Sequence, residues 1–103
     1  MSVEQPIFPA YGTGQLIATN TTAVNVTNLP KDSKQLMLTA IGQNCYVRVT
    51  DSADTSVATV ADLLVNTTNF RLISKGELSR LSVVSPGGAG QLHVIGCDGQ
   101  TGM

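Results

Sequence analysis

The sequence predicts an all-β protein: a single antiparallel β-sandwich or small jelly roll with an extended N-terminal arm. Three observations support this. Apolar and polar residues alternate in short runs, turn-forming residues recur roughly every 8–12 positions, and no window shows a convincing helical period. A chain of 103 residues has room for one domain. We therefore expect an arm over residues 1–13 and a sandwich domain over residues 14–103.

The predicted arm is interrupted by two prolines and two glycines. Proline fixes φ and lacks a backbone donor, so this stretch favours an extended arm rather than a strand inside a sheet. Bulky side chains on such an arm need a surface that covers them. The residues expected to bind a partner are Ile7, Phe8, Pro9 and Tyr11.

Eight runs beyond the arm have the composition of β-strands. They lie at residues 15–19, 22–27, 35–42, 44–50, 63–66, 69–74, 80–85 and 91–96. Residues 28–34 and 86–90 are rich in Pro, Asp and Gly, which predicts turns. Residues 97–103 are expected to be a polar tail.

Alternation within these runs predicts which side chains face the core, because successive strand residues point to opposite sides. In residues 35–42, Leu36, Leu38 and Ala40 share one face, while Met37 and Ile41 share the other.

The other alternating runs are interpreted in the same way. Cys45, Val47 and Val49 are expected to point inward, as are Leu92 and Val94. Near residue 70 the prediction is limited to one point: Phe70 and Leu72 share a face opposite Arg71.

The composition argues against several classes of partner. Charged residues make up 13% of the chain and the net charge is −1, whereas nucleic-acid binding requires a basic patch. Low charge combined with 42% hydrophobic residues also argues against a disordered chain. The first residues have no signal-peptide pattern, and no apolar run approaches the ~18 residues of a membrane helix. We expect a protein that is made in a cytoplasm and binds neither nucleic acid nor membrane.

The sequence offers no catalytic cluster. His93 is the one histidine and has no acid, nucleophile or second ligand near it in sequence, so it is expected to be a solvent or interface residue. Asp51 and Asp54 are too few for a calcium loop and are expected in a solvated turn. We expect no catalytic residue, no metal and no cofactor.

The two cysteines are too far apart in sequence for a zinc-ligand pattern. Cys45 belongs to the apolar face of its strand. Cys97 falls on the face opposite Leu92 and Val94, because it is an odd number of residues away from both. The two side chains are therefore expected on different faces, as separate thiols, unless Gly96 breaks the strand and cancels the count.

Few Lys and Glu residues remain for the surface, and Thr, Ser, Asn, Gln and Ala are abundant. Proteins that stay soluble alone carry more surface charge. This composition favours a chain that packs against copies of itself or against a scaffold, and a plain soluble β-domain is the alternative.

The order of segments resembles that of small virion proteins encoded beside the capsid genes of tailed bacteriophages. The resemblance runs from about Pro6 to Gly99. It rests on the segments QPIFPAYGTGQ, ATNTTAVNV, KQLMLTAIG, NCYVRVTDS, ATVAD, LLVNTTNFRLISKG and LSVVSPGGAGQLHVIGCDG. It is a likeness of pattern and spacing rather than of one diagnostic motif.

The resemblance implies a non-enzymatic capsid decoration (cement) protein at the virion surface. It implies a homotrimer that sits where major capsid protein subunits meet, with the arm reaching along neighbours. It also implies that the connector between the runs at 44–50 and 63–66 is free to contact a neighbour. The alternatives are a head–tail connector, a tail or fibre-base component, and a glycan-binding attachment module.

Overall fold

Nine strands and no helix form the part of the chain that the structure, a computed structural model, describes: residues 7–9 and 12–99. The all-β prediction is confirmed, and each of the eight predicted runs overlaps one strand. The strands are β1 (Ile7–Pro9), β2 (Gln15–Thr19), β3 (Val24–Val26), β4 (Gln35–Ile41), β5 (Cys45–Thr50), β6 (Leu63–Val65), β7 (Arg71–Ser74), β8 (Arg80–Val84) and β9 (Gly90–Gly99).

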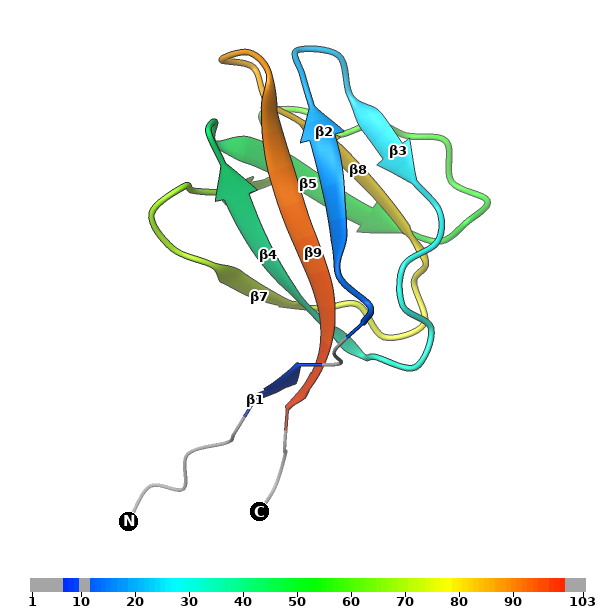
Figure 1. Cartoon of the computed structure of the whole chain (residues 1–103). Helices are drawn as coiled ribbons and strands as arrows, with labels where there is room; N and C mark the ends of the chain where they lie inside the picture. Colours follow the sequence, from blue (N-terminus) through cyan, green and yellow to red (C-terminus); the bar gives the residue numbers. More distant parts are fainter. Residues whose placement is uncertain (1–6, 10–11, 100–103) are drawn as a thin grey trace.

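The strands form two sheets that pack face to face (Figure 1). The five-stranded sheet has the order β1-β9-β4-β7, and β2 also pairs with β9. The four-stranded sheet has the order β3-β8-β5-β6. All pairs are antiparallel. The predicted antiparallel sandwich is therefore confirmed.

The strand pairs are nested, which is the pattern of a jelly roll. β2 pairs with β9, β3 with β8, β4 with β7, and β5 with β6. The chain thus resembles one long hairpin rolled up, so that successive pairs alternate between the two sheets. The connector at residues 51–62, between β5 and β6, is the tip of that hairpin.

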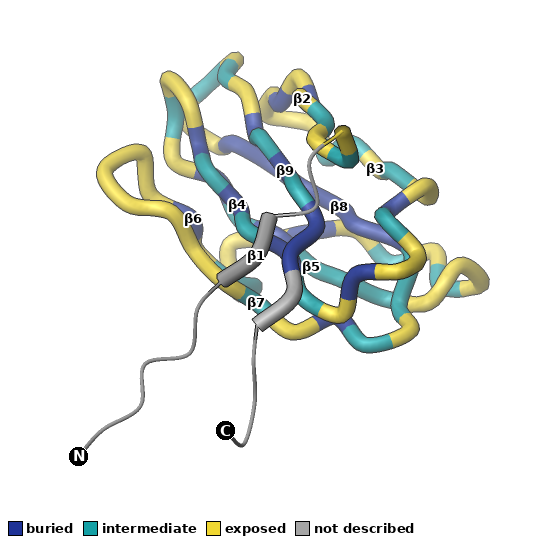
Figure 2. Tube along the Cα trace, turned by 60° about the horizontal axis from the view of Figure 1, so that its bottom comes forward, coloured by how far each residue is buried: buried dark blue, intermediate teal, exposed yellow. Residues whose placement is uncertain are grey.

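The core lies between the sheets and is aliphatic. Leu36, Leu38 and Ala40 are buried on β4, as the alternation predicts, and half-buried positions lie between them. Figure 2 shows the same alternation of buried and half-buried residues along β4 and β9. Cys45 and Val47 of β5 meet this layer from the opposite sheet.

The structure shows which side chains near β7 point outward and which point toward the core. Phe70 and Leu72 are exposed, whereas Ile73 packs against the core. The register agrees, because Ile73 lies opposite Leu36 and Leu72 lies opposite Met37. The face that Phe70 and Leu72 share is therefore the outer one.

β9 is longer than the sequence predicts. Residues 97–99, expected in a polar tail, extend the strand and pair with residues 7–9. β1 lies at the edge of the sheet, where a proline is tolerated because its missing donor is not needed for a second neighbour. The other residues of the predicted arm lie outside the described residues, apart from Gly12 and Thr13. The arm as a whole stays a prediction.

Candidate functional site

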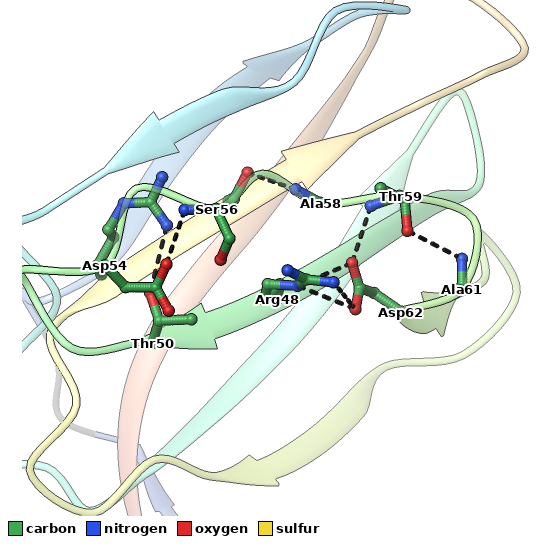
Figure 3. A network of polar contacts seen from close by, with 10 residues as sticks. Arg48, Thr50, Asp54, Ser56, Ala58, Thr59, Ala61 and Asp62 are labelled. Atoms are coloured by element: carbon green, nitrogen blue, oxygen red, sulfur yellow. Dashed lines mark hydrogen bonds and ion pairs between the residues drawn. The ribbon is translucent and has the colours of Figure 1, made fainter.

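The two outer faces of the sandwich differ, and the difference defines the candidate site. The connector at residues 51–62 crosses the outer face of the four-stranded sheet (Figure 3). The backbone N–H of Ala58 donates a 2.8 Å hydrogen bond to Oγ of Ser82, a fully buried residue of β8. The connector therefore packs directly on the sheet.

An ion pair fixes the end of the connector. Nε of Arg48 on β5 lies 3.0 Å and 3.1 Å from the two carboxylate oxygens of Asp62. The backbone N–H of Thr59 donates to the same carboxylate at 2.8 Å. Partial burial by itself raises the pKa of Asp62, but the hydrogen bonds from Thr59 and Arg48 outweigh it and hold that pKa below its usual value.

A second aspartate anchors the start of the connector. The side chain and backbone of Ser56 hydrogen-bond the carboxylate of Asp54 and lower its pKa. Beneath it, the buried side chain of Arg80 donates from Nη1 to Oγ1 of Thr50 at 3.2 Å. Arg80 also adds a favourable charge interaction with Asp54.

These contacts bear on one expectation. The resemblance implies a connector free to meet a neighbour, and hydrogen bonds hold its backbone to its own sheet. Most of its residues are nevertheless exposed, including Val57 and Val60 at 45% and 66%, so contact with a neighbour stays a prediction.

We predict that Asp62→Ala releases the connector without unfolding the sandwich. The change leaves the Arg48 guanidinium and the Thr59 N–H without their shared acceptor. The expected loss is about 1–2 kcal/mol of unfolding free energy, since partial exposure of Arg48 screens the pair. Faster proteolysis and faster hydrogen exchange within residues 52–61 measure the release.

The same contacts predict a loosening of the connector in acid. A carboxylate with a depressed pKa in the folded state stabilises the fold fully above its unfolded value, about 3.8 here, and this contribution is lost as the pH falls through the folded value. Protection from exchange in residues 52–61, measured against the intrinsic exchange rate at the same pH, is therefore expected to fall below about pH 4. The matched control for Asp62→Ala is Asp32→Ala, which removes an exposed carboxylate in the loop at 28–34. If Asp32→Ala increased exchange in residues 52–61 as much as Asp62→Ala does, this account would be contradicted.

The outer face of the five-stranded sheet, in contrast, is accessible. We call the outward side of β2, β9, β4 and β7 the open face. Cross-strand pairs define its rows, with Leu16 opposite His93 and Met37 opposite both Ile95 and Leu72. Its apolar and central members are Leu16, Met37, Ile41, Leu72, His93 and Ile95.

The open face combines exposed aliphatic side chains with uncharged polar ones such as Gln91. Leu16, Ile41 and Leu72 are 57%, 45% and 38% exposed. None of its outward positions from residue 16 to residue 95 carries Lys, Arg, Asp or Glu. Arg71 belongs to β7 but lies opposite Leu38, on the other side of that strand. An uncharged sheet face with exposed aliphatic side chains is suited to contact with protein.

The described residues offer little for other chemistry. His93 lies on the open face as predicted, and its Nε2 would be only 3.1 Å from a Cβ at Gly14, so the imidazole leans over that glycine. Within residues 12–97, His, Cys, Asp and Glu side chains form no group of three that could hold a metal ion.

The two cysteines are separate thiols, as predicted, and both are buried. The burial of Cys97 was not predicted, because the alternation placed this residue on the face opposite Leu92 and Val94. Cys45 belongs to the core cluster between the sheets. Burial raises its pKa to about 11, so the thiol is protonated at neutral pH and a poor nucleophile.

A shallow hollow lies at the start of β2. Its volume is about 330 Å³, and its lining has no ionisable side chain: Gly12, Thr13, Gly14, Gln15, Asn28 and Pro30. It therefore lacks groups for acid–base or nucleophilic chemistry.

None of the predicted arm residues belongs to the four strands that define the open face. The backbone of Ile7, Phe8 and Pro9 forms β1 at the sheet edge, while Tyr11 lies outside the described residues. The site prediction did not include Leu16, Ile41 or Leu72. One signal for them was present: the run at 35–42 has apolar residues on both faces, which a strand with one solvated face does not need.

Comparison with protein-family models, with curated proteins and with solved structures found no match for this chain. In the described part of the chain, no helix has the length and apolar character needed to cross a membrane.

Proposed function

We propose that this chain is a non-enzymatic structural protein of a virion, a capsid decoration protein that stabilises a phage head by binding across capsid subunit joints. Its partners are the major capsid protein and copies of itself, in a homotrimer at the capsid surface. The proposal rests on the segment order of the sequence together with one structural observation. On one outer face the connector packs on the sheet, whereas the other face is accessible and carries aliphatic and uncharged polar side chains.

The mechanism of such a protein is burial of surface. Each Å² of apolar area removed from water contributes roughly 25 cal/mol before the costs of ordering and association. A rigid sandwich adds little ordering cost, because its core and its connector are already fixed by the contacts described above. Jelly rolls occur in viral capsids but also in lectins and cupins, so the fold is compatible with this role without selecting it.

The aromatic residues favour a structural role over glycan binding. Sugar-binding sites use exposed aromatic rings grouped with polar neighbours. Tyr46 is half-buried on the outer side of β5, while the exposed Phe70 precedes β7 in the other sheet. These two rings therefore do not form one platform.

The number of copies per particle tests the proposal. Purified virions from the phage that encodes this chain are analysed by quantitative mass spectrometry, with the major capsid protein as the internal standard. A copy number comparable to that of the capsid protein is expected. A number lower by more than an order of magnitude would point to a connector, tail or fibre base, and absence from the virion would overturn the proposal.

A further inference from the structure

We infer that copies of this chain associate through the open face, which each copy turns toward the others. The inference rests on the self-association included in the proposed function and assigns it to one surface. It requires that the open face be free on the isolated chain, that it be large enough, and that a second copy suit it better than other partners.

The open face is free on the isolated chain. Leu16 on β2 and Ile41 on β4 are about half exposed, although both lie within regular strands. On the opposite side of the sandwich, Ser82 of β8 is fully buried where Ala58 of the connector packs. The fold thus covers one outer face and leaves the other accessible.

The face is also large enough to be an interaction surface. β4 contributes seven residues. At about 3.4 Å per residue, and with four strands about 4.8 Å apart, the face measures at most on the order of 450 Å², since β2 and β7 are shorter than β4. The aliphatic side chains cover part of this area and uncharged polar side chains the rest.

The same area predicts how strong the contact is. Each copy that turns its open face into the contact hides at most about 450 Å², roughly 900 Å² for any two copies, which is below the ~1,200 Å² of standard stable interfaces. The contact is therefore expected to be reversible and concentration-dependent in the micromolar range.

Charge favours a second copy as the occupant. A partner that brings a charged side chain onto the open face would bury it without a counter-ion, which is strongly unfavourable. The open face of another copy meets this requirement, because its outward positions are uncharged over the same extent. The chain carries a net charge of only −1, so copies repel one another little.

Sedimentation velocity on the full chain tests the inference, over concentrations that span the micromolar range. The wild type is expected to shift reversibly from the 10.7 kDa monomer toward a larger species. Leu16→Lys and, independently, Ile41→Lys are expected to weaken this association at least about tenfold, because each places an unpaired charge in the contact. Both positions are exposed, so the variants should fold, and thermal unfolding verifies this.

The matched control is Val60→Lys, since Val60 is more exposed than either residue but lies on the connector side of the sandwich. It is expected to associate like the wild type. If the wild type stays monomeric throughout, self-association itself is wrong. If the wild type associates and both open-face variants associate equally well, or if Val60→Lys is as defective as they are, the assignment to this face is wrong. The copy number in virions is measured separately, so the decoration proposal can fail or stand independently of these outcomes.

Discussion

Replacing Leu38 by Ala is expected to lower the free energy of unfolding by about 2–5 kcal/mol, the largest effect of any single change considered. Leu38 is fully buried on β4 and lies between β7 and β9, with Arg71 and Val94 as its cross-strand neighbours. The truncation removes a large apolar side chain from between two sheets whose strands are fixed by backbone hydrogen bonds, so the cavity cannot collapse fully. Urea denaturation of dilute protein measures the loss.

The adjacent residue provides the control. Met37 is next to Leu38 but points to the open face, half-buried rather than enclosed. Met37→Ala is expected to cost less than about 1 kcal/mol in the monomer. If the two substitutions destabilised the protein equally, the assignment of the β4 faces, and with it the position of the core, would be incorrect.

Gly96→Ala is expected to destabilise the protein by about 1–3 kcal/mol through overpacking. A Cβ at this position would overlap Oγ of Ser33, and it would lie 2.8 Å from Cβ of Ser33 and 3.0 Å from Cβ of Pro30. Rotating the serine hydroxyl away relieves only the first of these contacts. The backbone of the loop at 28–34 must therefore move away from β9.

Two further variants test whether overpacking, rather than the replacement of a glycine by alanine as such, causes the loss of stability. Adding Ser33→Gly to Gly96→Ala removes both serine contacts and should recover most of the lost stability. Gly14→Ala places a Cβ near the end of the His93 ring, which can turn aside, so its cost should be small. Without recovery in the double variant, another cause must be sought for the effect of Gly96→Ala.

The sandwich was predictable because strand alternation is a local signal. The faces of residues 35–42 and 44–50 follow from one residue in two being apolar, and Leu36, Leu38, Cys45 and Val47 are buried accordingly. The separate thiols follow from the same count, since Cys97 is out of phase with Leu92 and Val94. The predicted run at 35–42 included Gly42, whereas β4 ends at Ile41 and Gly42 takes a positive φ of 84°, which glycine adopts readily.

The pairing of β1 with the end of β9 was not predictable in the same way. Neither IFP nor CDG alternates, and each becomes a strand only because the other lies beside it. Their separation in sequence, about ninety residues, leaves no local trace of that contact. The prolines of the first segment pointed to an extended backbone, which is correct for residues 7–9, but not to a partner strand.

The position of the connector depended on tertiary contacts in a similar way. Its small polar residues suggested a solvated loop. In the structure Asp62 binds Arg48 and Ala58 donates to Ser82, and both contacts require β5 and β8 to lie side by side. The open face was half visible in the sequence. The alternation placed Met37 and Ile41 on the face away from the core. It could not show that the neighbouring side chains on β2, β9 and β7 are also uncharged, because this depends on how the strands are paired.

Methionine oxidation measures most directly whether the open face is a protein–protein contact. Met37 is the only methionine between the two termini, and it lies on that face. Hydroxyl-radical or peroxide oxidation of Met37 is followed by peptide mass spectrometry, in dilute purified protein and in intact virions. We expect Met37 to be oxidised in the dilute protein and strongly protected in the virion, while exchange in the connector at residues 52–61 stays the same. Equal oxidation of Met37 in both states would contradict the account, because the open face would then be uncovered where the protein is assembled.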